Sequence, residues 1–392
     1  DTMAKTPAAA NDLMMRVWAP AKARVAEEVA DMRAIAGHDI EPWDYLYYAE
    51  KVRKQKYDLD QNQLKPYFEL HNVRAGSFYM AERLYGFTFE RLAPGTVPVF
   101  HEDVVVYAVK DHGEPIGLFY ADDYARPGKR SGAWMTSLRD QQKLDGDVAP
   151  LVINVCNFAK GADGAPSLLS PDDARTLFHE FGHGLHHMLT QVNERDVSGI
   201  SGVEWDAVEL PSQFMENWCW DPEGLALISG HYQTGEALPQ DKLDMMLAAK
   251  NFQSGMMMAR QLEFSLFDFE LHATHGDGRS VLEVLEHIRD EVSVMRPPAY
   301  NRFPNSFAHI FSGGYAAGYY SYKWAEVLSS DAFSRFEEEG VFNAETGRAF
   351  REAILARGGS QEPMVLFVDF RGREPSIDAL LRHLGLVAEA AA

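Results

Sequence analysis

The segment from His179 to His183 constrains this chain more than any other. It reads His-Glu-Phe-Gly-His, and apolar residues on both sides predict that it lies within a packed helix. Residues four apart share one face of an α-helix, so the two imidazoles can reach a single Zn²⁺ ion. Glu180 lies about 100° around the helix, beside the metal, where its carboxylate can accept a proton from water. The alternative is an exposed charged helix face, which the apolar flanks disfavour because buried polar groups need partners.

A zinc site of this kind needs a third protein ligand, and the spacing leaves several candidates. One known pattern places a histidine ten residues after the first, but that position is Leu189. His186 lies on the ligand face of the predicted helix, although three successive turns of one straight helix reach a single ion poorly. The other candidates are carboxylates further along the chain, namely Glu194, Glu204, Glu209 and Glu216.

Glu209 lies at the start of a predicted helix, within residues 206–213. Asp206 and Glu209 also have the spacing of a capping box, so a capping role for Glu209 is the alternative interpretation. Glu216 follows seven residues later on the same helical face. We expect Glu216 and Asp206 to support the metal ligands from outside.

A second group of polar side chains lies late in the chain. It consists of His309, Gly313, Gly314, Tyr315, Tyr319 and Tyr322. The two glycines predict a mobile loop, because glycine tolerates positive φ. The three tyrosines follow at helical spacing and predict one face of a helix, for which an aromatic core stripe is the simplest interpretation. Phenol hydroxyls and an imidazole can also donate to the oxyanion that forms when water attacks a peptide bond.

The rest of the chain predicts a mostly α-helical fold with one small β-sheet beside the zinc helix. The expected regions are a helical segment over 1–84, a sheet region over 85–160 and a helical zinc-binding region over 161–392, all within one continuous catalytic domain. Short apolar runs bounded by glycine, proline or aspartate predict strands at 97–100, 104–109, 116–121 and 151–156. Helical spacing predicts helices over 8–36 (interrupted at Pro20), 43–55, 60–84, 240–272, 279–294, 315–337, 345–357 and 376–386, with a further helix opened by Pro171.

Charge and cysteine content exclude several kinds of partner. The 392 residues carry a net charge of −21, which repels phosphate backbones and anionic lipids, so we expect no nucleic acid and no membrane partner. No apolar run reaches the ~18 residues of a membrane-spanning helix. The two cysteines, Cys156 and Cys219, lie in apolar surroundings, which fits a reducing compartment such as the cytoplasm.

Taken together, these motifs resemble the thimet oligopeptidase family of zinc peptidases. The resemblance rests on residues 179–186, 209–218 and 313–324, and it extends over nearly the whole chain. Residues 202–209 and 371–375 are more similar to the oligopeptidases of that family than to its dipeptidyl carboxypeptidases. Members of the family are much longer, so the chain is expected to be their C-terminal catalytic part.

The resemblance implies a zincin-type metallopeptidase that hydrolyses internal bonds of short peptides with one Zn²⁺ and a water activated by Glu180. It implies zinc ligands at His179, His183 and Glu209, substrate and oxyanion contacts at His309, Tyr315 and Tyr322, and further substrate contacts at Gly313, Gly314 and Tyr319. It also implies that the strand around Asn154 pairs with the substrate backbone as an edge strand.

Two alternatives stay open at this point. A dipeptidyl carboxypeptidase of the same family would need a donor for the C-terminal carboxylate of the substrate. A zinc- or peptide-binding fragment without turnover would need no general base, and the presence of Glu180 disfavours it.

Overall fold

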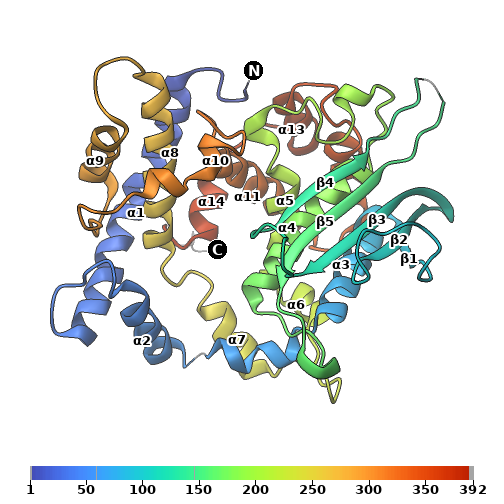
Figure 1. Ribbon diagram of the computed structural model, residues 1–392, viewed down its shortest axis with the longest axis horizontal. Helices are drawn as coiled ribbons and strands as arrows, with labels where there is room; N and C mark the ends of the chain where they lie inside the picture. Colours follow the sequence, from blue (N-terminus) through green and yellow to red (C-terminus); the bar gives the residue numbers. More distant parts are fainter. Residues whose placement is uncertain (1, 59, 145, 388–392) are drawn as a thin grey trace.

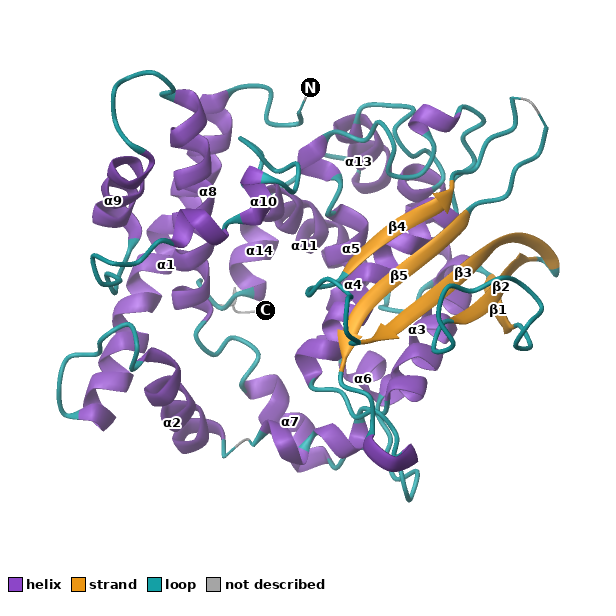
Figure 2. Ribbon diagram, viewed as in Figure 1, coloured by secondary structure: helices purple, strands orange, loops and turns teal. Residues whose placement is uncertain are grey.

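The computed structural model describes residues 2–58, 60–144 and 146–387, and it shows a mostly helical chain with one β-sheet at one side of the molecule (Figures 1 and 2). This confirms the predicted fold class. The helices are α1 (Pro7–Ala36), α2 (Tyr45–Tyr57), α3 (Leu70–Tyr85), α4 (Pro171–Met188), α5 (Leu210–Glu216), α6 (Pro222–Ile228), α7 (Gln240–Ala248), α8 (Ser254–Ala273), α9 (Val281–Val292), α10 (Ala308–Phe311), α11 (Ser321–Glu339), α12 (Ala344–Phe350), α13 (Pro363–Arg371) and α14 (Asp378–His383). The strands are β1 (Phe87–Arg91), β2 (Val105–Asp111), β3 (Glu114–Tyr124), β4 (Trp134–Arg139) and β5 (Leu151–Phe158).

The sheet has the strand order β1-β2-β3-β5-β4. Strands β3 and β5 are parallel, and every other neighbouring pair is antiparallel. The expected edge position of Asn154 is therefore wrong. Asn154 lies in β5, opposite Ala121 of β3 and Met135 of β4, so the backbone of its strand is paired on both sides. The edge strand next to α4 is β4, which packs against that helix (Figure 2).

Several predicted boundaries differ from the structure for identifiable reasons. The segment 97–100 was predicted as a strand and forms none. Strands β1 and β4 were not predicted, because they lie at the two edges of the sheet, where a strand needs no continuous apolar run. Helix α1 continues through Pro20, since packing against α8 holds it together. The predicted helix over 240–272 is divided into α7 and α8 near Gln253, whose φ of 59° is not helical.

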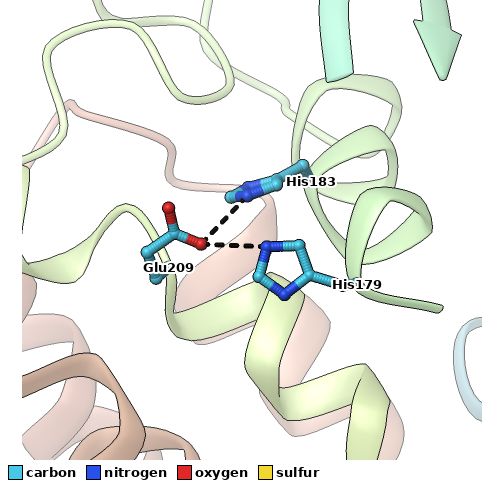
Figure 3. A group of neighbouring side chains, drawn as sticks. All are labelled: His179, His183 and Glu209. Atoms are coloured by element: carbon cyan, nitrogen blue, oxygen red, sulfur yellow. Dashed lines mark ion pairs between the residues drawn. The ribbon is translucent and has the colours of Figure 1, made fainter. Parts of the chain in front are cut away.

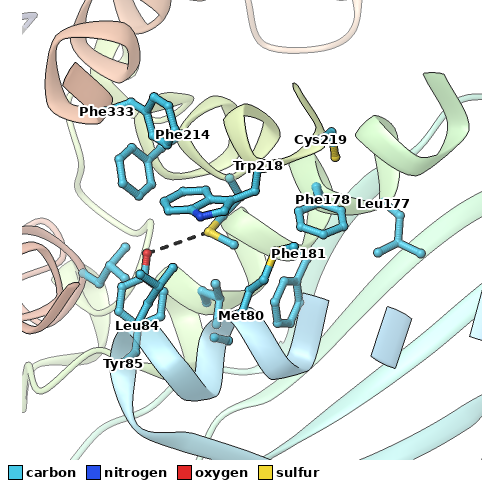
Figure 4. Packing of buried hydrophobic residues seen from close by; sticks show 14 of the residues in the cluster. Met80, Leu84, Tyr85, Leu177, Phe178, Phe181, Phe214, Trp218, Cys219 and Phe333 are labelled. Carbon is cyan, nitrogen blue, oxygen red and sulfur yellow. Dashed lines mark hydrogen bonds between the residues drawn. The ribbon is translucent and has the colours of Figure 1, made fainter. Parts of the chain in front are cut away.

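The buried apolar residues form two large clusters. The sheet-side core includes Phe119 of β3, Phe181 of α4 and Trp218, and it mixes aromatic rings with aliphatic side chains (Figure 4). The α1/α8 core includes Val17 of α1 and Leu262 of α8. Helix α11 contributes to both clusters, so it joins the two halves of the molecule.

Among the described residues, no helix combines the length and the apolar character needed to cross a bilayer.

Candidate active site

Three side chains from two elements converge on one point (Figure 3). The Glu209 Oε2 atom lies 3.2 Å from His179 Nε2 and 3.1 Å from His183 Nε2. One nitrogen or oxygen atom from each residue lies within 4.8 Å of the other two. Ligands about 2.0–2.1 Å from an ion in tetrahedral geometry are separated by about 3.3 Å, so these residues fit a Zn²⁺ ion with one open position.

Local sequence explains why these residues meet. Ser170 and Asp173 form a capping box that starts α4, and the two histidines follow on its buried face. At Gly182, an added Cβ would lie only 2.3 Å from the carbonyl oxygen of Pro211, so glycine allows α5 to approach α4 closely. This approach places Glu209, the residue before α5, opposite the imidazoles.

Neighbouring side chains fix the orientation of the ligands. Glu216 Oε1 lies 2.7 Å from His179 Nδ1, which leaves the Nε2 atom of that ring facing Glu209. The Glu209 carboxylate accepts hydrogen bonds from the Tyr315 hydroxyl at 2.8 Å and the Ser212 hydroxyl at 2.9 Å. Glu209 makes no side-chain cap of α5, so the capping interpretation is wrong. The contact of Ser212 was not predicted, although this residue lies inside the segment that carries the resemblance.

Glu180 is only 5% exposed and lines the same cavity as the three candidate ligands. Burial raises its pKa above the ordinary value for glutamate, against the attraction of His179 and His183. Burial acts in the same direction on Glu209, but hydrogen bonds and charge from the two histidines outweigh it and hold the pKa of Glu209 well below its usual range. The two carboxylates therefore differ in basicity although they lie in one site.

The tyrosine group meets the same site, but not as one helical face. Tyr315 and Tyr319 lie in a turn, and α11 begins only at Ser321, so the helix predicted from residue 315 starts six residues late. The Tyr315 and Tyr322 rings are stacked with centroids 5.0 Å apart. The Tyr319 hydroxyl instead donates to Gln261 of α8 at 3.2 Å.

His309 approaches the three tyrosine rings, with centroids 5.6–6.4 Å from theirs. Gly313 and Gly314 are exposed in the turn that follows α10. Gln213, which was not predicted, donates from Nε2 to the Tyr322 carbonyl oxygen at 3.0 Å. This bond ties the tyrosine group to the helix that follows Glu209.

Two predicted residues lie elsewhere. The Asp206 carboxylate accepts hydrogen bonds from the backbone of Met3 and Ala4 and from the Tyr320 hydroxyl, so it does not support the metal ligands directly. His186 is 2% exposed and lines a small apolar cavity with Val203 and Leu210. Burial lowers the pKa of His186 to about 3, and it is a packed, neutral residue rather than part of the ligand group.

The site lies where two hollows of the surface meet. One has a volume of about 580 Å³ and extends toward α8 and α14, and the other, of about 640 Å³, extends along β4. Both are lined by His179, Glu180 and Tyr322. The arrangement is a cleft with the candidate metal site near its middle.

Comparison with known proteins agrees with this geometry. A family model described as peptidase family M3 matches residues 1–386. The chain belongs to peptidase family M3. It is 51% identical to oligopeptidase A of Escherichia coli (strain K12) over 98% of this chain and 58% of that protein. It is also 47% identical to an organellar oligopeptidase A of Arabidopsis thaliana, over 89% of this chain and 46% of that protein.

The M3 chain is 40% identical to the dipeptidyl carboxypeptidase of Escherichia coli, over 98% of this chain and 58% of that protein. It thus spans less than two thirds of the curated relatives it matches. Among solved structures, an M32 carboxypeptidase from Deinococcus radiodurans R1 has a TM-score of 0.50 and 15% identity, over 95% of this chain and 65% of that chain. This last similarity concerns the fold alone.

Proposed function

We propose that this M3 chain is a zinc-dependent oligopeptidase that hydrolyses internal bonds of short peptides. The observation that carries the proposal is the position of His179, His183 and Glu209 near the middle of a cleft that continues on both sides. A peptide can then extend past the site in both directions, as cleavage of an internal bond requires. The similarity to oligopeptidase A supports the same activity.

His179, His183 and Glu209 would hold one Zn²⁺, with Glu216 orienting the His179 ring. Zinc bound there would supply a Lewis acid, which would make the attacking water more acidic and polarise the carbonyl group of the substrate. Glu180 accepts the proton of the attacking water and passes it to the leaving amine, a role favoured by its raised pKa. Tyr322 donates its hydroxyl to the developing oxyanion, with Tyr315 and His309 as neighbours.

The backbone of the substrate has a suitable partner in β4. This strand is at the edge of the sheet, and its residues 134–137 line the larger hollow. An unpaired strand edge binds an extended peptide by main-chain hydrogen bonds and therefore accepts varied sequences. We infer short peptides as the substrates and a reducing compartment such as the cytoplasm, because both cysteines are free and buried.

Dipeptidyl carboxypeptidase activity is the second candidate function. The hollow toward α8 and α14 is lined by two lysines, Lys250 and Lys323. Lys323 forms an ion pair with Glu326, whereas Glu337 and Asp221 influence the charge of Lys250 without forming an ion pair with it among the described residues. An ammonium group in the cleft is the kind of donor that a C-terminal carboxylate needs.

One experiment separates these functions. Zinc is measured by elemental analysis, and a decapeptide is digested with a free or an amidated C-terminus and followed by mass spectrometry. An oligopeptidase cleaves internal bonds of both peptides, whereas a dipeptidyl carboxypeptidase releases dipeptides only from the free form. If the chain bound zinc but cleaved neither peptide, the result would favour a zinc- or peptide-binding fragment without turnover.

A further inference from the structure

A buried carboxylate outside the site holds the turn that carries the active-site tyrosines. Asp268 of α8 has no exposed surface. Its Oδ1 atom accepts a hydrogen bond from the backbone N–H of Ala317 and its Oδ2 atom from that of Tyr319, both at 2.9 Å. Among the described residues, the carboxylate has one side-chain partner, His272 of the same helix, whose Nδ1 atom lies 3.0 Å from Oδ1. Each oxygen of the carboxylate thus accepts a hydrogen bond from the backbone of one turn.

The conformation of this turn depends on such an anchor. Ala317 has a φ of 55°, a left-handed conformation that an L-residue with a side chain adopts only when its surroundings impose it. The side chain of Ala317 is exposed, so its own packing does not account for this conformation. Successive N–H groups around a residue of this kind form a concave donor site for an anion, and the Asp268 carboxylate fills it.

The anchored turn is connected directly to the catalytic groups. Tyr315 lies two residues before Ala317, and its hydroxyl contacts the metal ligand Glu209 at 2.8 Å. Tyr322 follows three residues after Tyr319 and is held on its other side by Gln213. A shift of the turn would therefore move both phenol groups relative to the metal site.

We propose that Asp268 is a positioning residue of the active site, which sets the places of Tyr315 and Tyr322 by binding the backbone of residues 317–319. The proposal rests on the function proposed above. Asp268 contacts none of the candidate metal ligands and does not itself line the cleft, so it acts only through the turn that it binds. Because it belongs to α8, it also couples the α1/α8 half of the molecule to groups that act on the substrate.

Asp331 of α11 provides a matched control. It too has no exposed surface, and it accepts hydrogen bonds from the side chain of Arg373 at 2.6 Å and from the backbone of Ser376 at 2.7 Å. Its partners belong to the C-terminal segment rather than to the tyrosine turn. Asp331→Asn therefore removes a comparable buried carboxylate without changing the anchor of the turn.

The first test measures hydrogen exchange of backbone amides in the 392-residue chain. Asp268→Asn removes the charge and one of the two acceptor oxygens, so amides of residues 317–319 should exchange at least ten-fold faster while those of α4 keep their rates. Asp331→Asn should leave the turn unchanged. Unaltered exchange of residues 317–319 in Asp268→Asn would overturn the proposal. If Asp268→Asn does not fold, the same exchange measurement is made on Asp268→Ser, whose side chain is uncharged and smaller.

The second test is a double-mutant cycle in peptide cleavage. Asp268→Asn should lower kcat by up to about 100-fold with zinc content unchanged, because a small misplacement of catalytic groups has effects of this size. In a Tyr322→Phe background the same change should lower kcat much less, because the hydroxyl that Asp268 helps to position is already absent. An equal fold-loss in both backgrounds would assign Asp268 a merely structural role. A wild-type chain that binds zinc and cleaves nothing would refute the proposed function instead, and the exchange test would still decide the placement.

Discussion

Glu180 and Glu209 are both buried carboxylates, and their neighbours give them opposite properties. Glu209 faces the Nε2 atoms of His179 and His183, whereas Glu180 lies beside the histidines without an ion pair among the described residues. In the proposed function, the raised pKa would make Glu180 the better proton acceptor, and the lowered pKa would keep Glu209 anionic for a metal ion. The opposite pKa shifts of the two carboxylates follow from their different positions relative to the two histidines.

We expect Glu180→Gln to fold and bind zinc but to lose nearly all turnover. The amide has almost the same volume as the carboxylate but cannot accept the proton of the attacking water. Loss of a general base lowers the rate by roughly 10²–10⁴. Zinc content and kcat are measured on the same preparation, and near-normal kcat would point to another base.

Tyr322→Phe and Tyr315→Phe should affect different quantities. The Tyr315 hydroxyl is already committed to Glu209, so its loss should weaken zinc retention during dialysis against a chelator. Burial raises the pKa of Tyr322, so its hydroxyl stays a neutral donor at working pH. Tyr322→Phe should lower kcat by about 10²–10³ and leave zinc bound. A change in KM alone would make Tyr322 a residue that binds the ground state.

Sequence patterns could identify some of these residues and not others. The spacing of His179 and His183 fixes their common face in any helix, so this pair is predictable. Spacing alone could not separate Glu209 from Glu216, because which carboxylate faces the imidazoles depends on the packing of α5 against α4. Asp206 was misassigned for a similar reason, since its partners at Met3 and Ala4 lie about two hundred residues away in sequence.

At the scale of elements, the distance between α4 and α5 decides whether the ligands meet. A Cβ at Gly182 would lie 2.6 Å from Ser212 Cα, whereas one at Gly184 would have its nearest neighbour at 3.4 Å. Both glycines belong to α4, so both replacements by alanine gain about the same helix propensity, ~1 kcal/mol.

Gly182→Ala should therefore destabilise the fold by about 1–3 kcal/mol and reduce zinc affinity, because the backbone of α5 must move away. Gly184→Ala should be close to neutral or slightly stabilising. Urea unfolding and zinc titration of the two variants are compared. Equal stability of the two would show that the approach of α5 does not limit the site.

Helices and strands could be predicted where the local sequence pattern determines them. They could not be predicted where contacts between distant parts of the chain determine them. Helix α4 has a capping box and a consistent apolar face, and it forms as the sequence indicates. Helix α11 starts at Ser321 because Asp268 holds residues 317–319 in a turn, which no local pattern encodes. Strand β4 escapes prediction because its apolar residues form neither a continuous run nor a regular alternation, and because its partner β5 comes later in the chain.

At the scale of the whole molecule, α11 connects the two hydrophobic clusters and carries Tyr322 at one end and Asp331 in its middle. Asp331 binds Arg371, at the end of α13, as well as Arg373 and Ser376, and so fastens the C-terminal segment to this helix. The C-terminal part of the chain in turn lines the cleft through Leu380 and His383.

This fastening should make stability depend on pH in a defined way. Burial alone would raise the pKa of Asp331, but hydrogen bonds from Arg373 and Ser376 outweigh it and hold the pKa below its ordinary value. A carboxyl whose pKa is lowered on folding stabilises the fold above its unfolded pKa of about 3.9, and this stabilisation is lost as the pH falls through the folded pKa. Asp331→Asn should therefore be less stable than the wild type by about 1–3 kcal/mol at pH 7, the range for hydrogen bonds to charged groups.

The difference between Asp331→Asn and the wild type should shrink as the pH falls below about 4, where the carboxyl is protonated in the unfolded chain first, and it should vanish once the pH has fallen below the lower folded pKa. Urea midpoints of both proteins, measured without zinc from pH 7 to pH 3, give this difference directly. Contributions shared by the two proteins, including those of the metal ligands, cancel in the comparison. A difference that stays constant over the whole range would mean that the charge of Asp331 does not hold the C-terminal segment, and that packing of α13 and α14 against α11 holds it instead.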